Sequence, residues 1–123
     1  MQPPNSGAPP HVWPKQRRFP RYRTDLPLRV RNQQERDLDG CCIGISEGGL
    51  GGILPEPIPV GSVVQLRLSL PTHPTALEVR AVVRHQLDDL RHGFEFVSLT
   101  EAERLSIRQF CNELAIQSPS RAR

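Results

Sequence analysis

The sequence lacks a long hydrophobic run, and its 123 residues include one Trp and one Tyr. No stretch approaches the roughly 18 consecutive apolar residues that a membrane helix needs, and the proline-rich start has no apolar core of the signal-peptide kind. We therefore expect a soluble, cytoplasmic protein that does not insert into a membrane. The scarcity of aromatic residues argues against a nucleic-acid-binding surface built on base stacking.

Cysteine is also scarce, and the three cysteines do not form a motif. Cys41 and Cys42 are neighbours and Cys111 is distant in the sequence, so no CxxC spacing exists. The four histidines are scattered, and no Cys/His spacing suits a zinc site. We expect reduced, partly buried thiols, with neither a metal nor another cofactor.

Positive charge is concentrated in the first third of the chain. Residues 1–36 contain eight Lys or Arg and two acidic residues, whereas residues 37–123 contain eight basic and eleven acidic residues. Such a surplus favours anionic partners. At this point nucleotides, nucleic acids and anionic lipids all stay open as partners.

The densest basic cluster comprises Arg17, Arg18 and Arg21. Pro20 favours an extended chain here, so the side chains of Arg17 and Arg21 leave the same face, roughly 13 Å apart. Guanidinium groups present a planar fork of donors that matches phosphate oxygens. The cluster is therefore our candidate for holding an anionic ligand, and a solvated basic linker is the alternative.

Composition divides the chain into one domain and two tails. Residues 1–15 are rich in Pro, Gly, Ser and Asn, which predicts a flexible tail. Residues 16–116 are predicted to form the domain, and residues 117–123 a disordered C-terminal tail. No internal repeat is visible.

Alternating apolar residues bounded by turn residues predict about six short strands. The expected strands span residues 26–31, 40–45, 50–54, 63–70, 77–83 and 93–97. Thr100 and Glu103 then fit a capping box. A helical apolar stripe follows, made of Leu105, Ile107, Phe110, Cys111 and Leu114. The predicted fold is mainly β, a six-stranded antiparallel β-barrel whose open end is covered by one C-terminal α-helix.

The segment 44–48 matches the GxSxG pattern of serine hydrolases. A nucleophile elbow needs a helix directly after the serine, and the glycines that follow Ser46 oppose one. We therefore expect no enzymatic activity. A binding turn fits better, because Gly48 and Gly49 allow positive φ and close approach of a ligand to the backbone, while Ser46 offers a hydroxyl. An ordinary glycine-rich hairpin turn is the alternative.

Four features taken together resemble the PilZ domain family. They are Arg17-x-x-x-Arg21, Ser46-x-x-Gly49, Val60-Gly61 and Gly93-Phe94-Glu95-Phe96, in this order along the chain. The resemblance covers about residues 16–115 and rests on order and spacing rather than on one motif. It implies a six-stranded antiparallel barrel with a C-terminal helix. It also implies binding of cyclic di-GMP, a bacterial second messenger with two phosphates and two guanines.

The resemblance assigns roles to residues by their position in the motifs. Arg17 and Arg21 would hold phosphates and guanine faces, with Arg18 as an extra donor. Ser46 and Gly49, the matching positions of the second motif, would line the ligand on the barrel surface. Signalling would then proceed through an altered contact with a downstream protein partner.

One position departs from the family pattern. The family has Asp or Asn where this chain has Gly44, and loss of a good base contact costs about 1 to 3 kcal/mol, roughly tenfold to hundredfold in affinity. Glu47 is a neighbouring carboxylate whose direction the strand pattern leaves open. A second hypothesis therefore stands beside the receptor: a PilZ-like protein-interaction module that does not bind cyclic di-GMP.

Overall fold

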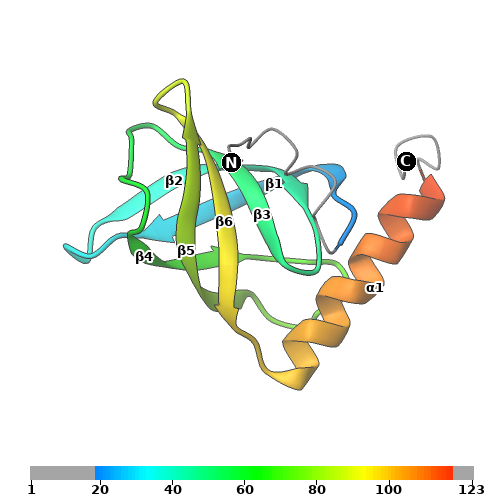
Figure 1. Cartoon of the computed structure of the whole chain (residues 1–123). Coiled ribbons are helices and arrows are strands. Elements are labelled where there is room, and N and C mark those ends of the chain that lie inside the picture. Colours follow the sequence, from blue (N-terminus) through cyan, green and yellow to red (C-terminus); the bar gives the residue numbers. More distant parts are fainter. Residues whose placement is uncertain (1–18, 118–123) are drawn as a thin grey trace, which may run out of the picture.

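A computed structural model describes residues 19–117, which form a closed barrel of six antiparallel strands followed by one helix (Figure 1). The elements are β1 (Tyr22–Arg31), β2 (Asp37–Ile45), β3 (Gly49–Ile53), β4 (Val63–Leu68), β5 (Leu77–Leu87), β6 (Arg91–Ser98) and α1 (Glu101–Gln117). Around the barrel the order is β1-β2-β3-β6-β5-β4, and β4 pairs with β1 to close it. The predicted mainly β barrel with one C-terminal helix is confirmed.

The two predicted tails lie largely outside the described residues. The N-terminal tail, residues 1–15, belongs to the part of the chain that is not described. The C-terminal tail was predicted to start at residue 117, but α1 includes Gln117. Among residues 19–117, no helix is both long and apolar enough to cross a membrane.

The barrel interior is filled by the inward-facing half of each strand. In β4 the residues Val64, Leu66 and Leu68 are buried, and the residues between them are exposed. This two-residue period is what a strand with one face on a core requires. Together with Phe94 from β6 and Ile107 from α1, these side chains belong to one continuous hydrophobic core.

Helix α1 begins at the predicted capping box. The Thr100 hydroxyl oxygen accepts a hydrogen bond from the Glu103 backbone N–H (3.1 Å), and the Thr100 N–H donates to the Glu103 carboxylate (2.9 Å). The buried residues of α1 are Ser106, Ile107, Phe110 and Cys111. Leu105 was predicted to share this stripe, but its side chain is exposed. It lies two residues before Ile107, about 200° away around the helix.

Helix α1 covers one end of the barrel (Figure 1). In an antiparallel barrel the start of β1, the β2–β3 turn, the β4–β5 loop and the end of β6 all lie at the same end. Polar contacts hold the helix there. Thr72 of the β4–β5 loop donates to the Ser106 carbonyl (2.7 Å), and Arg108 pairs with Glu47 of the β2–β3 turn (3.2 Å).

The three cysteines are free thiols, with Cys42 and Cys111 buried and Cys41 half-buried. Burial raises the pKa of Cys42 and of Cys111 to about 12. The Cys41 thiol donates a hydrogen bond to the Asp25 carboxylate (3.1 Å), and this bond raises its pKa as well. All three sulfurs are therefore protonated at neutral pH, which makes them poor nucleophiles.

His92 fastens the β3–β4 loop to the barrel. Its Nε2 accepts a hydrogen bond from the Ile58 backbone N–H (2.9 Å), and Nδ1 therefore carries the proton donated to the Leu90 carbonyl (2.8 Å). The ring is buried beside the ring of Phe94, with centroids 6.0 Å apart. Burial lowers the pKa of His92 below 6.5. Protonation of Nε2 would remove the acceptor that Ile58 uses.

We expect the free energy of unfolding to fall as pH drops below about 6.5, the ordinary pKa of histidine. The unfolded state binds a proton at His92 more readily than the folded state, so stability rises with pH in this window and levels off above it. One proton gives a slope of at most about 1.4 kcal/mol per pH unit. Urea unfolding between pH 5.5 and 7.5 measures it. A slope that persists unchanged in His92→Gln, with exposed His85→Gln as control, contradicts the assignment.

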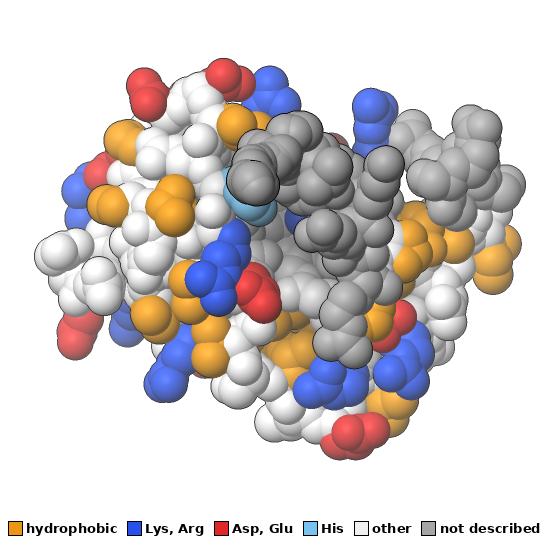
Figure 2. Space-filling view, viewed as in Figure 1, with side chains coloured by type: hydrophobic (Ala, Val, Ile, Leu, Met, Phe, Trp, Pro, Cys, Tyr) orange, Lys and Arg blue, Asp and Glu red, His pale blue; other side chains and the backbone are white. Residues whose placement is uncertain are grey.

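The basic surplus of residues 1–36 does not form one continuous positive surface in the part that is described. Three of its arginines are in exposed ion pairs across neighbouring strands or loops: Arg29–Asp39, Arg31–Asp37 and Arg36–Glu56. Figure 2 shows basic and acidic side chains interspersed over one face of the barrel. Exposed pairs contribute little to stability. Their effect here is to neutralise charge, so attraction of an anion depends on a local site.

Candidate ligand-binding site

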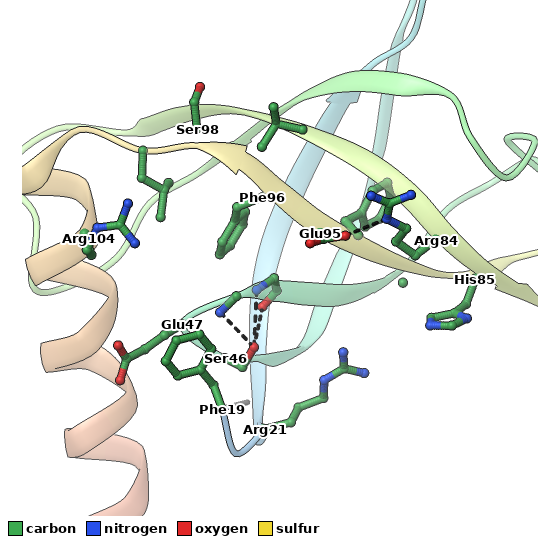
Figure 3. Close-up of a pocket in the computed structure, with 16 residues that line it drawn as sticks. Phe19, Arg21, Ser46, Glu47, Arg84, His85, Glu95, Phe96, Ser98 and Arg104 are labelled. Carbon is green, nitrogen blue, oxygen red and sulfur yellow. Dashed lines mark hydrogen bonds and ion pairs between the residues drawn. The ribbon is translucent and has the colours of Figure 1, made fainter. Parts of the chain in front are cut away.

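A cleft of about 620 Å³ opens on the outside of the barrel (Figure 3). Its walls come from the segment before β1, the β2–β3 turn, strands β5 and β6, and the first turn of α1. Small-molecule sites typically measure roughly 300 to 1,000 Å³. The predicted site residues that fall within residues 19–117 all line this cleft: Arg21, Ser46, Gly48 and Gly49. Arg17 and Arg18 lie outside the described residues.

Arg21 lies over a strip of the barrel that carries no side chains. A Cβ atom at Gly44 would be 3.4 Å from Arg21 Cδ, and a Cβ atom at Gly51 would be 3.9 Å from Arg21 Nη1. Gly44 and Gly51 are partners in the β2–β3 ladder. The strip continues to Gly93, the partner of Gly51 on β6. The arginine thus reaches across bare backbone, where a ligand can approach closely.

The β2–β3 turn is organised by Ser46. The buried Ser46 hydroxyl accepts hydrogen bonds from the backbone N–H groups of Gly48 and Gly49, both at 3.2 Å, and donates to the Gly49 carbonyl at 3.3 Å. The Ser46 N–H also donates to the Gly49 carbonyl (2.8 Å). In this arrangement the hydroxyl serves the turn. A direct contact between Ser46 and a ligand stays a prediction.

The glycines of this turn are needed for a reason other than the one predicted. Among the described glycines, Gly61 is the one with positive φ, so Gly48 and Gly49 do not use the positive φ that glycine allows. A Cβ atom at Gly49 would lie 2.0 Å from the Phe94 carbonyl oxygen. Close approach of β6 excludes any side chain there. At Gly48 the neighbour is the Phe19 ring, whose Cδ2 would lie 3.3 Å from a Cβ atom.

Strands β5 and β6 supply a wall of the cleft that the sequence did not reveal. Arg84 and His85 come from β5 and Glu95 from β6 (Figure 3). Arg84 Nε donates to Glu95 Oε1 at 2.5 Å. The His85 ring lies over Gly93, with its Cδ2 3.1 Å from where a Cβ atom would be. The Gly93–Phe96 motif pointed to β6 but gave no role to Glu95.

The end of the cleft nearest α1 contains Phe19, Glu47 and Arg104 (Figure 3). Glu47 pairs with Arg108 of α1 (3.2 Å). The direction of Glu47, left open by the sequence, is therefore toward the helix, and this carboxylate does not take the place of a side chain at Gly44. Arg104 brings a further positive charge to the cleft, in addition to Arg21 and Arg84.

Comparison with known families identifies the fold of this site. The family model described as PilZ domain matches residues 15–113. A search of curated proteins found no match.

Three solved structures illustrate the similarity, all below 25% identity. The Bacillus subtilis inhibitor of motility (MotI/DgrA) is 20% identical with a TM-score of 0.70, over 82% of this chain and 52% of that one. The PilZ domain of Escherichia coli YcgR with c-di-GMP is 14% identical, TM-score 0.67, over 87% and 97%. The K. pneumonia MrkH–c-di-GMP complex is 18% identical, TM-score 0.64, over 85% and 54%. This chain thus spans about half the length of two of these proteins.

Proposed function

This chain belongs to the PilZ domain family, and from that premise we propose that it is a bacterial receptor for cyclic di-GMP rather than an enzyme. One observation carries the proposal: Arg21 and the Ser46–Gly49 turn, far apart in sequence, line the same cleft. Solved relatives of the same fold, YcgR and MrkH, have been determined with c-di-GMP. The cleft supplies what such a ligand needs, a guanidinium beside bare backbone that a flat, charged molecule can approach.

Within this proposal Arg21 binds a phosphate, and Arg17 and Arg18 join it from the preceding segment. The turn residues Ser46, Gly48 and Gly49 contact the ligand from the barrel. Binding of one ligand by all three arginines would change the surface offered to a downstream protein partner in the cytoplasm. The output is a change of contact, with no bond made or broken.

Titration calorimetry of the full chain with cyclic di-GMP tests the receptor. We expect saturable heat with a dissociation constant in the micromolar range or below. Cyclic di-AMP, which has the same charge and backbone, is the control for non-specific attraction of an anion. Absence of heat with high micromolar cyclic di-GMP would contradict the proposal and favour the interaction module.

The departure at Gly44 gives a second test that separates the two hypotheses. A Cβ atom at this position would be 3.4 Å or more from its neighbours, which is ordinary van der Waals contact, and φ is not positive, so the backbone tolerates a substitution here. We expect Gly44→Asn to bind cyclic di-GMP tenfold to hundredfold more tightly, about 1 to 3 kcal/mol, by restoring a base contact. Gly44→Ala adds the same Cβ atom without an amide and should gain nothing. A protein-interaction module gains from neither substitution.

A further inference from the structure

A bulge in β5 turns two consecutive side chains toward the cleft. In the β5–β6 ladder Val83 pairs with Phe94 and His85 pairs with Gly93, so Arg84 is an extra residue with no partner of its own. Val83 is buried in the core, whereas both Arg84 and His85 are exposed. In a regular strand two neighbours would face opposite ways, and a bulge changes this. Arg84 thereby reaches the cleft beside Glu95 (Figure 3).

Glu95 is held by Arg84 through one of its two carboxylate oxygens. Arg84 Nε donates to Glu95 Oε1 (2.5 Å), and no hydrogen bond from residues 19–117 reaches Oε2. Glu95 is also the ladder partner of Gly49 in the β2–β3 turn. Because Gly49 has no side chain, nothing from that partner position stands over the carboxylate. Oε2 and the second lone pair of Oε1 can therefore accept hydrogen bonds from a ligand.

A carboxylate in this place selects against phosphate and for a neutral donor group. Phosphate oxygens would be repelled by Glu95, whereas Arg21, which comes from the other wall, attracts them. The Watson–Crick edge of guanine carries two adjacent donors, N1–H and the N2 amino group. Two parallel N–H···O bonds to one carboxylate are the geometry that Arg–carboxylate pairs use. The edge of guanine fits the two acceptors that Glu95 leaves open.

We propose that Glu95, positioned by Arg84, reads the Watson–Crick edge of one guanine of the bound dinucleotide. This inference rests on the proposed function and adds the base contact that Gly44 cannot supply. It makes Glu95 a specificity-determining residue. Adenine presents an acceptor, N1, where guanine presents a donor, so its edge would leave a carboxylate oxygen facing a lone pair. Because the ligand has two guanines, a further contact restored at Gly44 would act in addition to Glu95.

The sign of the effect of Glu95→Gln separates this role from simple electrostatics. Removal of a negative charge from an anion-binding cleft should strengthen binding of both cyclic di-GMP and cyclic di-AMP, and it also frees Arg84 for phosphate. If Glu95 contacts guanine, its replacement should instead weaken binding, and only binding of cyclic di-GMP. Glutamine keeps the length of the side chain but replaces one acceptor oxygen with a donor N–H group.

The experiment is a titration of the full-length chain and its variants with both dinucleotides. We expect Glu95→Gln to weaken cyclic di-GMP binding tenfold to hundredfold and to leave cyclic di-AMP binding equal or stronger. The matched control is Glu78→Gln, whose carboxylate pairs with Arg67 on the barrel exterior outside this cleft. That variant should behave as wild type. Thermal unfolding of each variant verifies the fold, since Glu95 and Glu78 are both exposed.

The outcomes of these titrations separate the role of Glu95 from the receptor function. Wild type that binds cyclic di-GMP, with Glu95→Gln unchanged or tighter, overturns the role of Glu95 and leaves the receptor standing. Equal weakening by Glu78→Gln overturns it as well, because the loss would then not depend on a carboxylate that lines the cleft. Wild type that binds neither dinucleotide removes the receptor and the base contact together.

Discussion

Replacement of Arg21 by alanine is expected to weaken cyclic di-GMP binding at least about 100-fold. Charge-assisted hydrogen bonds from a guanidinium are worth roughly 1.5 to 3 kcal/mol each, and loss of about 3 kcal/mol corresponds to about 100-fold. The side chain is exposed and lies over Gly44 and Gly51, so its truncation leaves no cavity in the core. The fold should survive. Calorimetric titration of Arg21→Ala measures the loss directly.

Two further variants show whether the guanidinium of Arg21 itself is responsible for the loss of binding. Arg29→Ala removes the same charge from β1, but Arg29 pairs with Asp39 and does not line the cleft. It should bind within a factor of about two of wild type, because exposed charges at a distance are screened. Arg21→Lys keeps the charge but not the planar fork, so we expect intermediate binding. If Arg29→Ala weakens binding as much as Arg21→Ala, attraction is non-specific.

Much of the barrel could be predicted from the sequence, because strands such as β4 show a clear two-residue alternation of apolar and polar residues. Val64, Leu66 and Leu68 alternate with exposed residues as expected. The residues at which strands begin and end were harder to predict. β1 begins at Tyr22 rather than at residue 26, because Tyr22 and Arg23 pair with Ile45 and Gly44. Such pairing depends on a distant segment and leaves no local pattern.

The candidate site also has a part that could be predicted from the sequence and a part that could not. The Ser46–Gly49 turn could be predicted because its hydroxyl and glycines are adjacent in sequence. The β5 wall could not, because the bulge that exposes both Arg84 and His85 is a property of the register between β5 and β6. A sequence read strand by strand assigns Arg84 and His85 to opposite faces. The resemblance to PilZ domains pointed to the motif residues but not to Arg84 and His85.

We expect Gly49, the glycine of the Ser46-x-x-Gly49 motif, to be required for the stability of the fold. In Gly49→Ala the new Cβ would lie 2.0 Å from the Phe94 carbonyl oxygen and 3.0 Å from its carbon. These are backbone atoms of β6, and Phe94 is buried in the core, so neither strand can shift alone. Overpacking of this kind costs typically 1 to 3 kcal/mol, occasionally more. We expect a loss of about 3 kcal/mol and a fall in Tm of more than about 10 °C.

Gly51→Ala is the matched control, because Gly51 lies two residues further along the same strand. The nearest atom to a Cβ there is the His92 carbonyl oxygen at 3.8 Å, an ordinary contact, so urea unfolding should give stability close to wild type. Equal destabilisation by both variants would contradict the steric reason. The pair also separates fold from ligand. The Gly51 methyl would lie in ordinary contact with Arg21 Nη1, at 3.9 Å, so Gly51→Ala should bind cyclic di-GMP about as tightly as wild type, whereas Gly49→Ala should lose binding because the barrel is destabilised.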